Sequence, residues 1–93
     1  MVIRTFRHRG LKRLFHDDDS SKIRADQIDR ITDVMAHLDR AHHPSDLDLP
    51  GYRLHQLKGS LKGIWNVTIS SNWRIVFRFE DGNAFDVDLV DYH

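Results

Sequence analysis

Hydrophobic and polar side chains alternate through WNVTISSNWRIVFRFEDGNAFDVDLV, residues 65–90. Alternation with a period of two indicates strands that bury one face. Two turn signals divide the stretch, because Ser70-Ser71-Asn72 reads as a tight hairpin and Asp81-Gly82-Asn83 is the strongest turn signal of the chain. Residues 65–90 therefore predict three strands of an antiparallel meander.

We expect the odd-numbered residues of these strands to share the buried face. They are Trp65, Val67 and Ile69, then Trp73, Ile75, Phe77 and Phe79, then Phe85, Val87 and Leu89. If helices cover that face, Arg74 and Arg78 stand on the open one. Arg78 can reach Asp86 or Asp88 of the next strand in a solvated cross-strand pair. Arg74 begins its strand and is the better candidate for binding an anion.

Outside the meander, the pattern predicts two helices and two more strands. Apolar residues at helical spacing place one helix near residues 8–16 and a second over 26–42, with Asp26 as its N-cap. Short hydrophobic runs predict strands over Val2–Phe6 and Tyr52–Leu57. The expected fold is α+β in the order β-α-α-β-β-β-β, with two N-terminal helices packed on one face of an antiparallel sheet.

The 93 residues suffice for one domain, 1–93, and the charges within it are unevenly distributed. Fourteen Lys and Arg balance fourteen Asp and Glu. Residues 1–13 and 49–79 each carry five cations and no acid, whereas 14–48 carry nine acids against four cations and 80–93 carry five acids and no cation. A local basic surface is therefore compatible with a net charge of +0, and a polyanion partner is not excluded.

Several function classes are excluded by composition. Without Cys there is no disulfide framework, thiolate nucleophile or Cys-ligated zinc site. The sequence has no apolar run long enough for a membrane span or a signal peptide, so we expect a cytoplasmic protein that does not contact membranes. His37, His42 and His43 lack metal-ligand spacing, and Asp17–Asp19 lacks the other ligands of a calcium loop. We expect no metal and no cofactor.

Two groups of residues could carry chemistry. His55 lies close to Arg53 and Lys58, which allows an anion site, although a lone His on a strand is more often a satisfied surface or core residue. The chain ends in Asp91-Tyr92-His93 directly after the last predicted strand. Terminal residues usually fray, but these three groups at the end of a rigid strand also form a candidate catalytic cluster.

Five separated segments carry a resemblance to a known family. They are IRTFRHRGL (3–11), DLPGYRLHQLKG (48–59), GIW (63–65), NWRIVF (72–77) and VDYH (90–93). Together they resemble the HigB (host-inhibition-of-growth) toxins, also called plasmid-maintenance killer proteins, of the RelE-like toxin–antitoxin group. The resemblance spans the whole chain. Gln56 stands where the family often has proline, a difference that we expect to matter little.

The resemblance implies a type II toxin that cleaves messenger RNA in the ribosomal A site without a metal ion, and thereby inhibits translation and arrests growth. A HigA-like helix-turn-helix antitoxin encoded beside the toxin would neutralise it. The toxin itself would meet DNA only indirectly, through that antitoxin.

The same resemblance implies which residues transfer protons. Cleavage requires a base that deprotonates the ribose 2′-hydroxyl and an acid that protonates the 5′-oxygen leaving group. By family analogy His55, Asp91 and His93 surround the site. We expect His93 to transfer a proton, with His55 or Asp91 as its partner, and the sequence leaves open which group is base and which is acid.

Other residues would hold the RNA. We expect Arg74 to clamp the scissile phosphate, because a guanidinium is always charged and binds in a bidentate manner. Lys58 would supply a second cation, Tyr92 would stack on a base or hydrogen-bond the backbone, and Arg53 and Lys62 would contribute to substrate binding.

Two non-enzymatic interpretations remain open. The same basic strands could belong to an RNA- or ribosome-binding module that blocks translation sterically. A structural adaptor that only engages another protein is less favoured, because it leaves Asp91, Tyr92 and His93 without a role.

Overall fold

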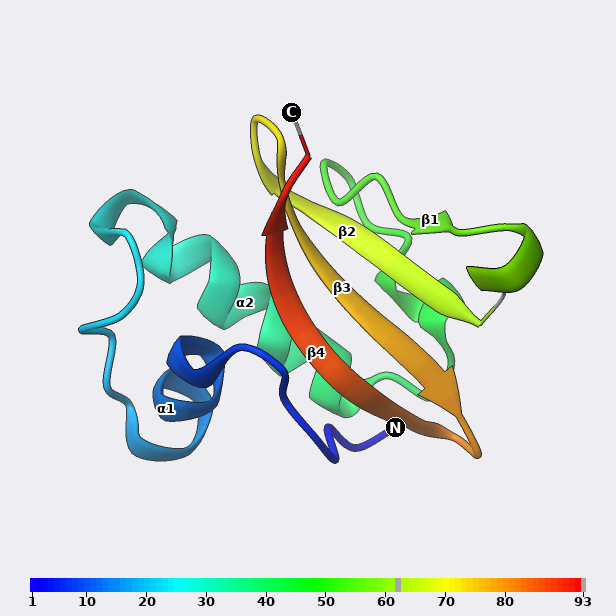
Figure 1. The fold of residues 1–93 in the computed structure, drawn as a ribbon, viewed down its shortest axis with the longest axis horizontal. Helices are drawn as coiled ribbons and strands as arrows, with labels where there is room; N and C mark the ends of the chain where they lie inside the picture. The colour runs from blue at the N-terminus through cyan, green and yellow to red at the C-terminus, as the bar shows by residue number, and fades with distance from the viewer. Residues whose placement is uncertain (62, 93) are drawn as a thin grey trace.

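Two helices precede a four-stranded sheet in the computed structural model, which describes residues 1–61 and 63–92. The elements in Figure 1 are α1 Arg9–Asp17, α2 Ile28–Arg40, β1 His55–Gln56, β2 Ile64–Ser70, β3 Trp73–Glu80 and β4 Asn83–Asp91. The strands lie in the order β1-β2-β3-β4, and neighbouring strands are antiparallel. The predicted α+β class and meander are confirmed.

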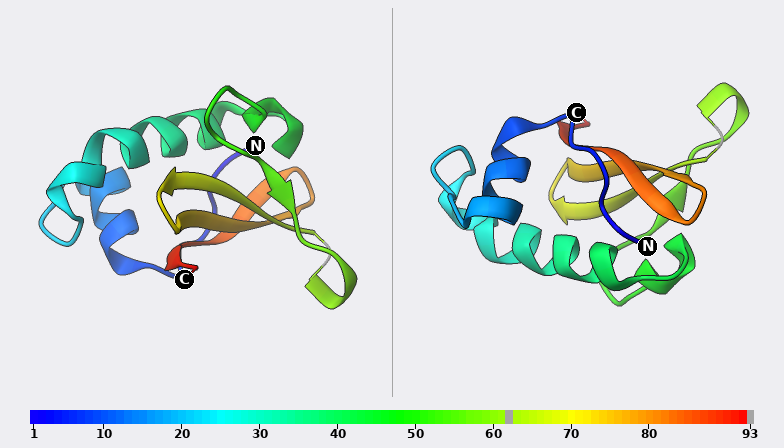
Figure 2. Two further views of the ribbon diagram at one scale, coloured as in Figure 1. Left: turned by 90° about the horizontal axis from the view of Figure 1, so that it is seen from above. Right: turned by 90° about the horizontal axis from the view of Figure 1, so that it is seen from below.

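Both helices lie on one side of the sheet, as the two views of Figure 2 show. Leu11 of α1 and Ile31 of α2 are fully buried, as are Val67 and Ile75 of the sheet. Each such side chain stabilises the fold by roughly 1.5–3 kcal/mol through loss of contact with water. The odd-numbered residues of β2 and β3 therefore face the helices, and the opposite face of the sheet remains open.

Tight turns join the long strands. Ser70 pairs with Trp73 and Glu80 pairs with Asn83, so each hairpin has two turn residues. Asp81 and Gly82 have φ values of 51° and 78°. Positive φ at both positions is typical of the type I′ turn, whose twist matches that of the flanking strands. Both predicted hairpins are thus confirmed.

A bulge in β4 changes which way Phe85 faces. Arg78 pairs with Phe85 and Val76 with Asp88, so two residues of β4 lie opposite the single Phe77 of β3. Asp86 has a φ of 55° there. Because an extra residue inverts the alternation, Phe85 lies on the face of Arg78 and not with Val87. The predicted placement of Phe85 on the buried face was wrong.

The first six residues form no strand, in contrast to the prediction for Val2–Phe6. Instead, Ile3 and Phe6 make isolated parallel bridges to Ala84 and Val87 of β4. The Thr5 hydroxyl accepts a hydrogen bond from the Asp86 amide at 2.8 Å, and a side chain thereby replaces a backbone rung at the bulge. The segment still covers the outer edge of β4.

The strand predicted over Tyr52–Leu57 is reduced to His55–Gln56, because the preceding residues form a turn. Gly51 and Arg53 have φ values of 84° and 50°, outside the range of an extended chain. The buried Tyr52 fixes this turn, since its amide donates to Leu49 O at 3.0 Å and its carbonyl accepts from Thr68 N at 2.7 Å.

The second helix also starts later than predicted. The turn Ala25–Gln27 is a 3-10 helix, and Gln27 precedes α2 without a side-chain cap. Asp26 is therefore not the N-cap; its carboxylate pairs with Arg24 at 2.8 Å. No helix within residues 1–61 and 63–92 has the length and hydropathy needed to cross a membrane.

Candidate active site on the open face of the sheet

A hollow of about 370 Å³ lies where β1, β2, β3 and the C-terminal segment meet. We call it the His55 hollow. Its lining residues are Arg53, His55, Leu57, Asn66, Thr68, Arg74 and Tyr92. The sequence placed four of these residues in the candidate site, and the fold brings those four together from positions up to 39 apart in the chain.

Strand pairing explains this convergence. His55 of β1 pairs with Asn66 of β2, and Thr68 of β2 pairs with Arg74 of β3. The C-terminal segment is held against the β2–β3 turn, because Tyr92 N donates to Asn72 O at 2.8 Å. Tyr92 is a large hydrophobic residue whose side chain stays exposed, at 46%. An ordered, exposed aromatic ring is well suited to stacking on a base.

The His55 hollow is cationic. Arg74 Nη1 donates to the carbonyls of Ser71 at 2.7 Å and Trp73 at 3.1 Å, which orients the guanidinium and leaves its other N–H groups available. Within the described chain no acid lies within ion-pair distance of Arg74 or of the exposed Arg53, and none lines the hollow. An anionic group is the natural ligand of such a surface.

Arg30 of α2 anchors the turn that carries Arg53. Its guanidinium donates to Gly51 O at 2.7 Å and to Thr68 O at 3.2 Å, and it stacks 4.5 Å from the centre of the Tyr52 ring. The Tyr52 hydroxyl is hydrogen-bonded to His37 Nδ1 at 3.0 Å. Burial raises the pKa of the Tyr52 phenol above its usual value of 10.0. No sequence pattern marks this support, because a single Arg in a helix is ordinarily solvated.

Asp91 does not line the His55 hollow. It lines a different depression of about 510 Å³, together with Arg24, Asp26 and residues of the β2–β3 turn. Adjacent residues of an extended chain point to opposite sides, which separates Asp91 from Tyr92.

One predicted cation, Lys58, does not line the His55 hollow. Lys58 is exposed beside the turn Gly59–Leu61, which projects from the sheet (Figure 1). His93 and Lys62 lie outside the described residues.

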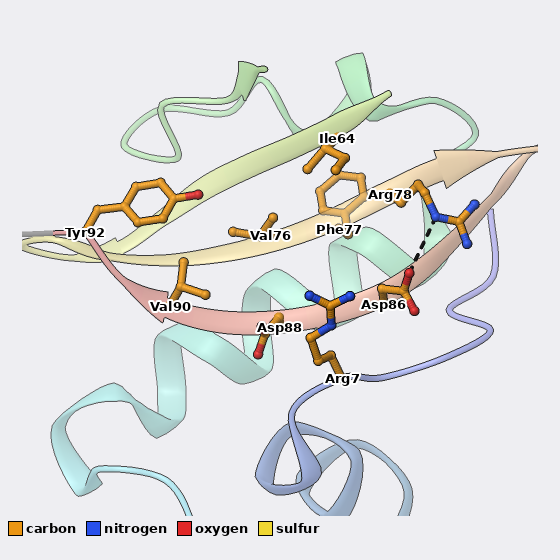
Figure 3. Close-up of a pocket in the computed structure, with 9 residues that line it drawn as sticks. All are labelled: Arg7, Ile64, Val76, Phe77, Arg78, Asp86, Asp88, Val90 and Tyr92. Atoms are coloured by element: carbon orange, nitrogen blue, oxygen red, sulfur yellow. Dashed lines mark hydrogen bonds and ion pairs between the residues drawn. The ribbon is translucent and has the colours of Figure 1, made fainter. Parts of the chain in front are cut away.

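A second hollow, of about 160 Å³, lies on the same open face and shares Tyr92 (Figure 3). We call it the Arg7 hollow. Its lining residues are Arg7, Ile64, Val76, Phe77, Arg78, Asp86, Asp88, Val90 and Tyr92. Arg78 forms ion pairs with Glu80 and with Asp86, the latter at 3.5 Å. The pair with Asp86 was expected from the sequence, and the pair with Glu80 was not. Arg7 was missed, because nothing in its sequence context separates it from the neighbouring arginines.

The family of the protein follows from comparison with known sequences. Residues 4–93 match the model of a family described as "RelE-like toxin of type II toxin-antitoxin system HigB". The chain is thus a RelE-like toxin, and its α+β fold agrees with that class. Within that class, it belongs to the HigB family.

Two relatives illustrate how close this relationship is. The chain is 40% identical over 92 residues to Endoribonuclease HigB of Proteus vulgaris, covering 99% of this chain and 100% of the relative. It is 29% identical over 86 residues to Toxin HigB-1 of Vibrio cholerae, covering 90% of each chain.

Solved structures confirm the fold at much lower identity. The YoeB dimer of Staphylococcus aureus aligns with a TM-score of 0.61 at 18% identity, over 99% of this chain and 97% of that one. YafQ of E. coli aligns with a TM-score of 0.59 at 15% identity, over 96% and 92%. These likenesses establish the RelE-like fold that was expected from the sequence.

Proposed function

We propose that this toxin is an endoribonuclease that cuts messenger RNA in the ribosomal A site and so stops translation. The observation that carries the proposal is the convergence of Arg53, His55, Arg74 and Tyr92 in one hollow that no described acid lines. The name of the Proteus vulgaris relative, Endoribonuclease HigB, supports the same chemistry.

The reaction needs three chemical contributions from the protein. A base removes the proton of a ribose 2′-hydroxyl, whose oxygen attacks the adjacent phosphorus; cations stabilise the charge that develops there; and an acid protonates the 5′-oxygen as the P–O5′ bond breaks. Arg74 and Arg53 flank the phosphate in this proposal. The products are a 2′,3′-cyclic phosphate and a 5′-hydroxyl.

Proton transfer belongs to the imidazoles in this scheme, because a histidine titrates near neutral pH. His55 lines the hollow, and His93 follows directly after Tyr92. Asp91 stays a proposed partner of His93, and its place on the far side of the β2–β3 turn favours an orienting role over direct contact with the RNA. Tyr92 stacks on a base beside the cut, while the charges of Lys58 and Lys62 attract the RNA.

The family also supports a protein partner. Type II systems pair a toxin with an antitoxin, and the structural neighbours include a heterotetrameric YoeB–YefM toxin–antitoxin complex from Staphylococcus aureus. We propose a HigA-like helix-turn-helix antitoxin as the partner, with DNA reached only through it. Action on ribosomes places the toxin in the cytoplasm.

A cleavage assay on programmed ribosomes tests the proposed function. Purified toxin should release a fragment with a 5′-hydroxyl end from an end-labelled message, and added EDTA should not slow the release. A truncation after Val90 should lose this activity, because it removes Tyr92 and His93, and its unfolding midpoint shows whether the fold is intact. Mapping of new 5′ ends in cells after brief induction should show cuts aligned with codons.

The steric alternative predicts the opposite pattern. A non-catalytic module that blocks the ribosome would inhibit translation without new message ends, and His93→Gln would inhibit as strongly as the parent protein. Uncut messages during full growth arrest would therefore contradict the enzymatic proposal.

A further inference from the structure

Arg7 is an unpaired cation that points onto the open face of the sheet. Figure 3 shows its guanidinium directed toward β3 from the segment beside β4. The side chain is exposed, and it has neither an ion pair nor a hydrogen bond to any residue of the described chain. Arg78, across the same hollow, is by contrast paired with Asp86 and Glu80 and stacks 4.8 Å from the centre of the Phe85 ring.

The floor of the Arg7 hollow is apolar and its volume is small. Ile64, Val76 and Val90 contribute the apolar surface. A volume of about 160 Å³ lies below the roughly 300–1,000 Å³ of small-molecule sites, so the hollow suits one planar ring better than a whole cofactor.

The carboxylates of this hollow restrict where an anion can lie. Asp86 is paired with Arg78, and Asp88 Oδ1 accepts from Leu89 N at 2.9 Å. Both would repel a phosphate placed between them. A phosphate is therefore favoured only at the rim, beside Arg7, with an uncharged group over the floor.

Tyr92 connects the two hollows. It lines the Arg7 hollow and the His55 hollow alike, and in Figure 3 its ring projects over the sheet from the end of β4. A single strand of RNA held at Arg74 therefore reaches the Arg7 hollow by passing this ring. An aromatic ring between two nucleotide positions is a common element of single-strand binding.

We propose that the Arg7 hollow is a second nucleotide subsite, which takes the base of an RNA nucleotide over Val76 and Val90 and its phosphate at Arg7. The proposal deepens the proposed function and rests on it for the identity of the substrate. The subsite contributes to binding of the RNA and not to the chemical step.

The test compares Arg7→Gln with Arg4→Gln, a matched exposed arginine of the same segment that does not line the hollow. The probe is a labelled single-stranded RNA with 2′-O-methyl groups, which cannot be cleaved. Arg7→Gln should weaken binding by roughly tenfold, the loss of one charge-assisted hydrogen bond. Arg7→Gln should also make the plot of log RNA association constant against log salt concentration less steep, by about 0.7 in slope. Arg4→Gln should change neither the affinity nor this slope. Equal thermal midpoints verify that both variants are folded.

Cleavage on programmed ribosomes gives the second readout. Arg7→Gln should raise KM with little change in kcat, as expected when a contact serves binding alone. Equal binding and equal KM for the two variants would overturn the subsite while the proposed function stands. Arg7-dependent RNA binding by a parent protein that never cleaves would support the subsite and refute the enzyme. An Arg7→Gln effect confined to antitoxin binding would overturn the subsite in favour of a protein ligand.

Discussion

Arg74 and Arg78, the two arginines that β3 places on the open face, are held in opposite ways. Arg74 in the His55 hollow is oriented by two backbone carbonyls and has no acid of the described chain within ion-pair distance. Arg78 sits four residues further along the same strand, yet Asp86 and Glu80 neutralise it. The strand and the residue type are shared, so the neighbouring acids alone decide which arginine can bind an external anion.

The contrast predicts its largest effect for Arg74→Gln against Arg78→Gln. Removing the unpaired guanidinium should lower kcat on ribosome-bound message by ~10²–10³-fold, or about 2.7–4 kcal/mol, as for other stabilisers of a charged transition state. Removing Arg78 should cost less than about tenfold, because an exposed ion pair contributes only ~0–1 kcal/mol. If single-turnover kinetics showed equal losses of kcat for Arg74→Gln and Arg78→Gln, the contrast between the two arginines would be wrong.

A second prediction concerns the anchor beneath the His55 hollow. Arg30→Met keeps an apolar stem but removes the guanidinium bonds to Gly51 O and Thr68 O. The free energy of unfolding should fall by about 1–3 kcal/mol, the cost of losing charged hydrogen bonds. Urea unfolding measures it. The rate of RNA cleavage should also fall in Arg30→Met. The contribution of Arg7 to RNA binding should persist, since Arg7 lies on another segment.

The smallest expected effect is a pH dependence of the folding stability that arises from Tyr52, the ring stacked against Arg30. The folded-state pKa of Tyr52 is raised by burial, so its neutral form is favoured in the folded protein. The resulting stability is fully present below pH 10.0, the ordinary pKa, and is lost as pH rises through the higher folded-state value. Tyr52→Phe should lack this alkaline loss in stability curves. An identical curve for both proteins would show that Tyr52 does not titrate as assigned.

The faces of β2 and β3 were readable from the sequence because alternation is a local property. Phe85 was misplaced because one inserted residue at Asp86 inverts the pattern, and the sequence around a bulge carries no clear mark of it. The chain around Arg53 was predicted to be a strand but forms a turn. Hydrogen bonds from Arg30 hold this turn, and the local sequence does not reveal them because Arg30 is distant in the chain.

The candidate site shows the same limit. His55, Arg74 and Tyr92, which the sequence grouped as candidates, line one hollow. Asp91 was grouped with them by the family resemblance and by its place in the C-terminal cluster, and in the described structure it lines a different depression. Arg7 went unnoticed because its position beside β4 depends on contacts between residues about eighty apart in the chain.

The docking of residues 2–7 along β4 has a consequence for timing. These early residues hydrogen-bond to Ala84 and Val87, so the edge of the sheet cannot close until those residues have been made. During synthesis the chain emerges from its N-terminus, and contacts so distant in sequence form last. Both Arg7 and Tyr92 take their places only at that step. The open face therefore carries both Arg7 and Tyr92 only after residues 84–92 have been synthesised.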